Sequence, residues 1–207
     1  MKFGVFIYDD GEPIDLATYG VLSMARRVAP TIELCTIAPK AGVVRLCSGL
    51  RVVADHGIHS APECDVLIVT GGPGWEIQAN NAQTLDFLRS RRPGTRLASV
   101  CTGAMILAAS GVLDGKKATT KREVLPPEPS PLELMRQRYP TIDVNAASLV
   151  DYDGITTSGG VTLCIDATLY IIERELGAHV ARETARIIEY SRAQDTNRRE
   201  FPSIVIT

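Results

Sequence analysis

The residues of this chain best suited to chemistry stand between a predicted strand and a predicted helix. A short apolar strand pattern covers Arg96–Val100, and an apolar, helix-forming run extends from Ala104 to Val112. Cys101 lies at the junction, and Gly103 permits a sharp turn there without a Cβ clash. A strand-to-helix elbow lifts a side chain out of the sheet and holds it rigidly beside the free N–H groups at the helix start.

This elbow predicts a reactive thiol at Cys101. The positive end of a helix dipole favours the thiolate, which is the nucleophilic form, and so lowers the pKa of a thiol. The alternative is a small core residue, because free cysteine is among the most buried residue types. The local sequence slightly favours the nucleophile over the core residue. Features elsewhere in the chain are needed to distinguish the two roles.

Composition excludes several classes of protein. The 207 residues carry 22 basic and 24 acidic side chains, and a net charge of −2 gives no electrostatic footprint for nucleic acid or a membrane. No run approaches the ~20 apolar residues that span a bilayer, and the first eight residues predict a strand rather than a signal peptide. The five cysteines are scattered without a C-x-x-C pair, which predicts neither a disulfide framework nor a metal site. We therefore expect a cytoplasmic protein that holds no metal.

Strand and helix patterns alternate along most of the chain. This alternation is typical of an α/β fold, a doubly wound, mostly parallel sheet with helices on both faces. No linker or repeat divides the sequence, so we predict a single domain over residues 1–192 and a C-terminal tail over 193–207. Strands are expected at 2–8, 31–38, 50–54, 65–70, 96–100, 142–150 and from 155, helices at 15–28, 81–91, 104–112, 132–139, 161–176 and 178–192, a hairpin within 39–57, and a turn at Pro93–Gly94.

Three loops of small residues, at 71–74, 101–103 and 158–160, follow predicted strands. The carboxyl ends of parallel strands bind ligands in such sheets, so the three loops should converge on one crevice. A tight turn explains any one of these loops, but it explains all three together less well. The loop at 71–74 is neither a dinucleotide fingerprint nor a phosphate loop. Trp75, directly after it, either lines a pocket or covers the core.

Five motifs occur in an order that resembles a known family. They are I-D-L at 14–16, V-T-G-G-P-G at 69–74, S-V-C-T-G-A at 99–104, A-T-T at 118–120 and T-S-G-G-V-T-L-C-I-D at 157–166. Over roughly residues 1–192 the chain resembles the ThiJ/PfpI superfamily, which implies a flavodoxin-like, class I glutamine amidotransferase-like fold. The C-T-G elbow with I-D-L upstream is most similar to the isonitrile hydratase branch and to the sensor domain of AraC-type regulators. The resemblance also implies a homodimer that acts on a small molecule without a cofactor.

The resemblance implies a role for each matching residue. Cys101 matches the nucleophile, and Asp15 matches the acidic residue that lies over the thiol. Gly72 and Thr102 match positions whose backbone N–H groups form an oxyanion-hole-like pocket. Without the resemblance, Asp15 would be interpreted as a helix N-cap, as an Asp at a helix start often is. The expected pocket residues are Gly71, Trp75, Gly160 and Thr162.

One departure from the family narrows the chemistry. Relatives often read T-T-H where this chain has Thr119-Thr120-Lys121, and no histidine follows Cys101 before His179. This disfavours a Cys–His dyad, and with it a peptidase, and favours a Cys–carboxylate site. Cys164 replaces a small residue that is common in relatives. Whether Lys121 or Cys164 takes part in the site stays open at this stage.

A carboxyl group beside a thiolate can act if burial and the neighbouring charge keep it protonated, so that it donates a hydrogen bond to sulfur. The sequence then predicts attack on a small isonitrile and release of an N-substituted formamide, with Cys101 as nucleophile and Asp15 as acid/base. A glyoxalase- or deglycase-like activity on small aldehydes is one alternative. The other is a non-enzymatic redox- or ligand-sensing domain, although the sequence shows no DNA-binding module.

Overall fold

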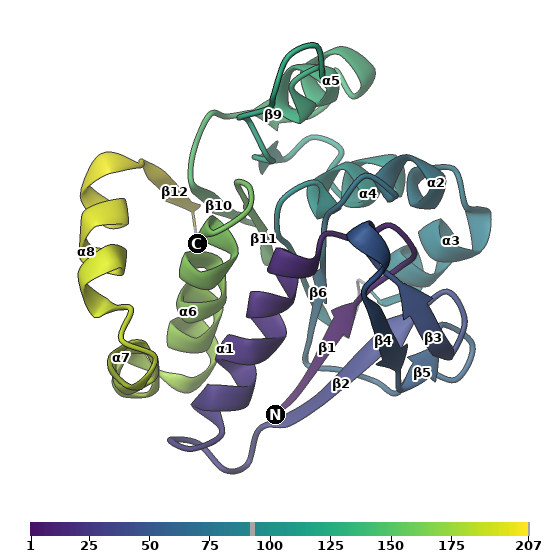
Figure 1. Ribbon diagram of the computed structural model, residues 1–207. Helices are drawn as coiled ribbons and strands as arrows, with labels where there is room; N and C mark the ends of the chain where they lie inside the picture. The colour runs from purple at the N-terminus through teal and green to yellow at the C-terminus, as the bar shows by residue number, and fades with distance from the viewer. Residues whose placement is uncertain (92–93, 207) are drawn as a thin grey trace.

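An eight-stranded sheet forms the centre of the protein in the computed structural model, which describes residues 1–91 and 94–206 (Figure 1). The strand order is β12-β10-β11-β7-β6-β1-β2-β5, and every neighbouring pair is parallel except β10 with β11. The predicted mostly parallel sheet is confirmed, whereas the turn at Pro93 and the end of the tail at Thr207 lie outside the described residues. The strands of this sheet are β1 (Lys2–Phe6), β2 (Glu33–Ala38), β5 (His56–Gly57), β6 (Val66–Val69), β7 (Arg96–Ser99), β10 (Leu149–Tyr152), β11 (Ile155–Ser158) and β12 (Ser203–Ile206).

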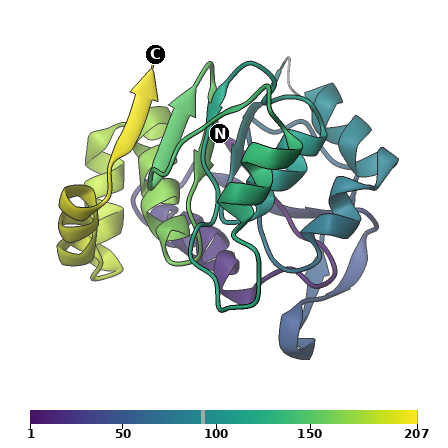
Figure 2. The same ribbon diagram turned by 90° about the horizontal axis from the view of Figure 1, so that it is seen from above.

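Helices cover both faces of the sheet (Figures 1 and 2). One face packs against α1, α6 and α7, and the other against α2, α3 and α4, each over its own apolar core. The predicted hairpin is present as β3 (Gly42–Arg45) and β4 (Arg51–Ala54), and β8 (Lys117–Ala118) pairs with β9 (Asp143–Val144). The helices are α1 (Ala17–Ala25), α2 (Trp75–Ala79), α3 (Ala82–Arg91), α4 (Gly103–Ala109), α5 (Pro131–Arg138), α6 (Leu163–Leu176), α7 (Ala178–Ile187) and α8 (Ser191–Glu200).

The alternating side chains of β1 explain why helices are needed on both faces. Phe3, Val5 and Ile7 belong to the core under α1 and α6, whereas Phe6 and Tyr8 belong to the core under α2 to α4. All five side chains are buried. Because successive side chains of a strand point to opposite faces, a strand that is apolar at every position has to be covered twice.

The structure differs from the predicted elements in several places. The helix expected from Asp15 begins at Ala17 instead, because Pro13–Leu16 forms a 3₁₀ turn. The helix expected over 178–192 ends at Ile187, where Glu189 adopts a positive φ of 57° and the chain restarts as α8. The turn after β6 also carries a short helix, α2, that the sequence pattern does not predict.

The segment predicted as a tail is part of the sheet. Its strand β12 pairs in parallel with β10, with Leu149 opposite Ser203 and Tyr152 opposite Ile206. The side chains of β12 are mostly exposed, so a burial pattern typical of a sheet strand is missing from this stretch. The position of β12 in the sheet depends on main-chain pairing with β10, about 50 residues earlier in the chain. Local sequence does not encode such pairing.

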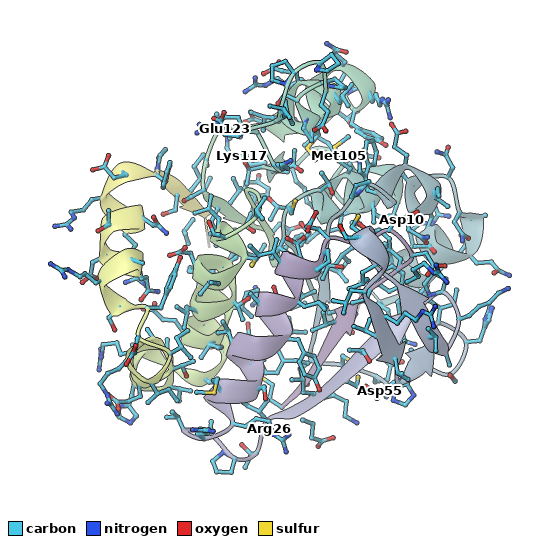
Figure 3. The ribbon with its side chains drawn as sticks, viewed as in Figure 1. Asp10, Arg26, Asp55, Met105, Lys117 and Glu123 are labelled. Atoms are coloured by element: carbon cyan, nitrogen blue, oxygen red, sulfur yellow. The ribbon has the colours of Figure 1, made fainter. Side chains whose placement is uncertain are left out.

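The sheet brings the carboxyl ends of β1, β6, β7 and β11 together, because these strands are neighbours and run in the same direction. Asp10, Met105 and Glu123 lie toward this end of β1 in Figure 3, while Arg26 and Asp55 lie at the opposite end. The loops that follow these four strands therefore surround one place, and Cys101 is in the middle of them.

Candidate active site

Cys101 occupies a strained elbow at the end of β7. Its φ is +53°, in the left-handed region that residues with a side chain seldom adopt. Hydrogen bonds on both sides hold it there: the Cys101 N–H donates to Gly159 O at 3.1 Å, and Thr120 Oγ1 donates to Cys101 O at 2.9 Å. Strain of this kind persists where the surrounding structure over-determines it, which is typical of functional sites.

The three loops of small residues meet at this elbow, as predicted. A Cβ placed on Gly71 would lie 2.5 Å from Thr102 N and 2.8 Å from Cys101 Cβ, so only a glycine lets the 71–74 loop lie against the elbow. The loop at 158–160 reaches it through the Gly159 carbonyl. The turn after β1 joins them, because Glu12 N donates to Gly71 O at 2.9 Å.

Gly103 gives a direct test of this close packing. A Cβ at Gly103 would lie 2.2 Å from Val69 O, which is main chain and unable to move aside. We expect Gly103→Ala to lower the free energy of unfolding by about 3 kcal/mol, in the upper part of the range for overpacked sites. Gly20→Ala is the matched control, because nothing lies within 4 Å of that Cβ in α1; it should stabilise the fold by up to about 1 kcal/mol. Equal urea midpoints for the two variants would contradict this reading of the elbow.

Asp15 is buried next to the elbow and is not a helix cap. Its side chain is 0% exposed, and Oδ2 accepts a hydrogen bond from the Gly71 N–H at 2.7 Å. The N-cap alternative is wrong, because Glu12 precedes the 3₁₀ turn, Leu16 precedes α1, and neither helix start is capped by a side chain. The second oxygen, Oδ1, has no hydrogen-bond partner among the described residues. A buried carboxylate oxygen without a partner is costly, which favours the protonated acid.

Burial shifts the pKa of both groups upward. It raises the pKa of Asp15 to about 7, although the Gly71 N–H opposes the shift. Burial, and then the charge of Asp15, raise the pKa of the Cys101 thiol to about 12. The prediction that the elbow lowers the thiol pKa is therefore wrong for the resting protein: the Thr102 N–H acts in the expected direction but is outweighed. Burial raises the pKa of the neighbouring carboxyl as expected, but the charge that adds to this rise is that of Glu12 and not that of the thiol.

The two predicted backbone donors are in different situations. The Thr102 backbone N–H lowers the pKa of the Cys101 thiol. The Gly72 N–H donates to Thr102 Oγ1 at 2.9 Å, so it is engaged with protein in this structure. It would face a reacting atom only after giving up the Thr102 hydroxyl.

A cavity of about 460 Å³ opens over Cys101. Trp75 lines it, and the guanidinium of Arg138 lies 5.4 Å from the Trp75 ring centre while also pairing with Glu76. Gly71 contacts the site through Asp15 rather than through the cavity wall. No histidine lines this cavity in the described part of the chain. Its lining residues are Glu12, Gly72, Pro73, Trp75, Glu76, Cys101, Thr102, Lys121, Val124, Glu128, Pro129, Pro131, Leu134 and Val161.

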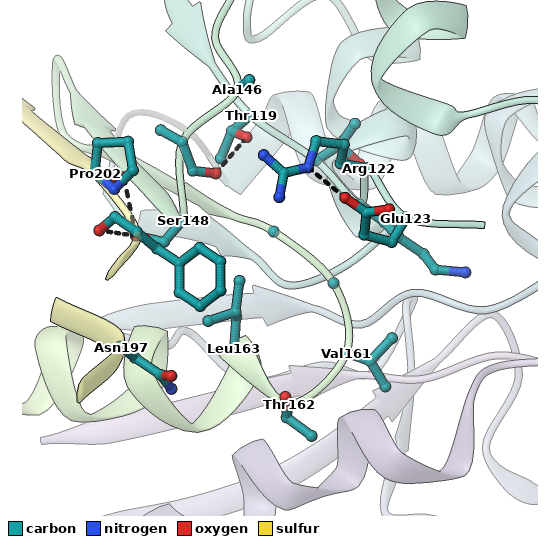
Figure 4. Close-up of a pocket in the computed structure, with 16 residues that line it drawn as sticks. Thr119, Arg122, Glu123, Ala146, Ser148, Val161, Thr162, Leu163, Asn197 and Pro202 are labelled. Atoms are coloured by element: carbon teal, nitrogen blue, oxygen red, sulfur yellow. Dashed lines mark hydrogen bonds and ion pairs between the residues drawn. The ribbon is translucent and has the colours of Figure 1, made fainter. Parts of the chain in front are cut away.

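A second cavity of about 210 Å³ adjoins the first (Figure 4). Gly160 and Thr162, predicted for the catalytic pocket, line this second cavity instead, and Lys121 and Val161 border both. Its outer wall comes from the C-terminal segment, where Ser148 Oγ donates to Pro202 O at 3.0 Å. Sequence patterns could not predict this division, because the two residues that border both cavities come from distant segments.

Cys164 lies close to the site but outside the cavity. Its thiol is 0% exposed and donates to Ile14 O at 3.8 Å, one residue before Asp15. Burial, followed by the charge of Asp15, raises its pKa to about 12, the same value as for Cys101. Cys164 therefore packs behind Asp15 as a core residue. Access from the cavity distinguishes Cys101 from Cys164, since their acidity does not.

Asp166, the last residue of the motif at 157–166, has a structural role on α6. It accepts hydrogen bonds from Tyr190 at 2.8 Å and from Asn197 at 2.9 Å and so ties α6 to α8. In the described ranges, no three His, Cys, Asp or Glu side chains form a group that could hold a metal ion. All five cysteines are free of disulfide bonds. None of the described helices is both long and apolar enough to cross a membrane.

The fold and the elbow define a class: an α/β protein with a strained cysteine at the carboxyl edge of a mostly parallel sheet. Residues 2–174 match the model of the DJ-1/PfpI family, and the chain belongs to that family. It is 28% identical over 197 residues to isonitrile hydratase of Pseudomonas putida, covering 93% of this chain and 80% of that protein. It is 30% identical over 148 residues to the HTH-type transcriptional regulator GbdR of Pseudomonas aeruginosa, covering 71% of this chain but only 38% of the regulator.

Solved structures agree on the fold. A ThiJ/PfpI family protein from Pseudomonas syringae superposes with a TM-score of 0.79 at 23% identity, covering 92% of this chain and 75% of that one. Drosophila melanogaster DJ-1beta superposes with a TM-score of 0.77 at 20% identity, covering 92% and 98%. The family therefore contains enzymes and regulators on one fold. The function of this chain has to be inferred from its site and not from the fold.

Proposed function

We propose that this protein hydrates a small isonitrile to an N-substituted formamide, with Cys101 as nucleophile and Asp15 as acid/base. The observation that carries the proposal is the buried carboxyl of Asp15. Its Oδ1 has no partner within the described part of the chain, and its pKa is raised to about 7 beside a thiol that lines a cavity. Such a group exchanges protons readily near neutral pH, as a general acid/base must. The similarity to an isonitrile hydratase over most of both chains supports the same reaction.

The first step adds the thiol across the isonitrile carbon. Sulfur forms a bond to the terminal carbon of R–N≡C, the S–H bond breaks, and its proton passes through Asp15 to that carbon. The product is a thioimidate, R–N=CH–S–Cys. Since the resting thiol has a raised pKa, Asp15 acts first as the base that makes sulfur nucleophilic and then as the acid.

The second step releases the formamide. Water attacks the thioimidate carbon, one water proton reaches nitrogen, and the C–S bond breaks to give R–NH–CHO. The other water proton returns to sulfur through Asp15, so the site is regenerated without a cofactor. The Thr102 N–H, which already faces the sulfur, would stabilise it as it leaves, and the Gly72 N–H would contribute after exchanging its present partner.

A substrate panel tests the function. The purified protein is incubated with alkyl and aryl isonitriles and with methylglyoxal, and formamide and lactate are measured against heat-treated protein. We expect formamide from at least one isonitrile and no lactate. Lactate alone would support the small-aldehyde alternative, which is disfavoured because no histidine among the described residues lines the cavity. Neither product, with tight binding of a small molecule, would support the sensing alternative that the similarity to GbdR raises.

We further propose that the protein acts as a homodimer in the cytoplasm. Both expectations come from the family resemblance and the free cysteines. Light scattering coupled to size exclusion would measure a mass near twice 22.4 kDa for the dimer.

A further inference from the structure

Lys121 is a cation in the wall of the catalytic cavity that the reaction as described does not use. It borders both cavities, so it lies between them. Its stem lies against Gly160: a Cβ on Gly160 would lie 2.5 Å from Lys121 Cγ and 2.9 Å from Lys121 Cβ. The glycine therefore provides the space in which the lysine stem lies.

The backbone next to Lys121 is fixed to the elbow. Thr120 Oγ1 donates to the carbonyl of Cys101 itself at 2.9 Å. Thr119 is held from two sides, through Thr157 Oγ1 and Ala147 O, each at 2.9 Å. Lys121 O accepts from Leu132 N at 3.1 Å. These bonds restrict where Lys121 can lie relative to the sulfur.

The ammonium group of Lys121 is not neutralised by a neighbour. Within the described ranges it makes no hydrogen bond or ion pair, whereas nearby Lys117 pairs with Asp143 and Arg122 pairs with Glu123. Its charge acts on the reacting groups, because it lowers the pKa of both Cys101 and Asp15. An unpaired cation in the cavity wall, next to a residue that is bonded to the elbow, favours negative charge in the cavity.

We propose that Lys121 is a positioning residue whose charge stabilises the negative charge that develops on the Cys101 sulfur. The proposal deepens the proposed function, because sulfur has to carry negative charge whenever its proton is on Asp15. Among the other charged groups, Glu12 in the turn after β1 raises the pKa of Asp15, and Glu76 and Glu128 also line the cavity. All of these are acidic, which leaves Lys121 to oppose them.

The test follows alkylation of Cys101 by iodoacetamide from pH 7 to pH 10, with the Cys101 peptide quantified by mass spectrometry. Lys121→Met keeps an unbranched stem on Gly160 but removes the charge. We expect its alkylation rate to fall about tenfold at every pH in this range, as a rise of one pKa unit dictates. Lys121→Arg should return the rate to within about threefold of the wild type, because the charge is restored. Lys117→Met is the matched control and should leave the profile unchanged, since its partner Asp143 lies on β9.

A purely structural role gives a different result. In that case Lys121→Met would lower the melting temperature and leave the pH profile where it was, which would overturn the proposal. Because alkylation needs no isonitrile, the two proposals can fail separately. A shifted profile in a protein without formamide production would reject the hydratase and keep the role of Lys121. An unchanged alkylation rate in Lys121→Met, in a protein that produces formamide, would reject the role of Lys121 and keep the hydratase.

Discussion

Cys101→Ala should reduce formamide production by at least about a thousandfold, to the level without protein, because nothing else in the cavity can form the thioimidate. Among the described residues that line the cavity, Cys101 carries the only thiol, and in the proposed mechanism its proton exchange with Asp15 begins the first step. The measurement is the initial rate of formamide release, with circular dichroism to verify that the variant is folded. The alanine keeps the Cβ and loses only sulfur, so the elbow should be retained.

Cys164→Ala is the control that makes this result specific. Its thiol is as buried as that of Cys101, and burial raises the pKa of both to about 12. Only Cys101 lines the cavity. We expect Cys164→Ala to lose about 1 kcal/mol of stability from the vacated volume while keeping its turnover. Loss of turnover in Cys164→Ala, together with its retention in Cys101→Ala, would reassign the nucleophile.

The sequence predicts the frame of this site well because the frame depends on local patterns. Residues 3–8, which include most of β1, are apolar or small, and buried side chains from both faces of this stretch require a sheet covered on both sides. Glycines after β6 and β11 mark loops that can approach the elbow closely, and the structure places Gly71 and Gly159 in direct contact with it. The buried strands and the glycine loops together predict that the Cys101 sulfur lies at the carboxyl edge of the sheet.

The electrostatics of the site could not be predicted from the same patterns. A thiol beside a helix start is expected to have a low pKa, but the helix contribution at Cys101 is outweighed by burial and by Asp15, both of which depend on distant packing. The structure places Gly160 and Thr162 in the second cavity for a similar reason, because Lys121, from another segment, borders both cavities beside Val161. Local sequence specifies which loops carry the small residues, and tertiary packing decides which cavity each one borders.

Asp15→Asn should keep the fold and lower kcat for isonitrile hydration by about a hundredfold or more, the usual contribution of a general acid/base. The amide oxygen can still accept the Gly71 N–H that Asp15 Oδ2 now accepts at 2.7 Å, so the side chain should stay in place. What the amide cannot do is take the proton from Cys101 and return it to carbon. The measurement is kcat from steady-state rates at pH 7, alongside melting temperature.

Asp166→Asn is the matched control. Burial also raises the pKa of Asp166, but its carboxylate accepts from Tyr190 and Asn197 between α6 and α8 rather than at the thiol. Its asparagine variant should retain turnover, whatever it loses in stability. If Asp15→Asn melted at a lower temperature and still hydrated isonitriles at the wild-type rate, Asp15 would be a structural residue.

The pH dependence of stability gives an independent test of the raised pKa of Asp15. Its pKa is about 7 in the folded protein and 3.8 as the ordinary value, so the folded state holds more protons between those limits. Stability from the protonated form is full below pH 4 and is lost as the pH rises toward 7, by about 4 kcal/mol at most. Urea unfolding at pH 4.5 and pH 7.5 should therefore show a smaller loss for Asp15→Asn than for the wild type. Equal losses would mean that the Asp15 pKa is not raised, and the acid/base role would lose its physical basis.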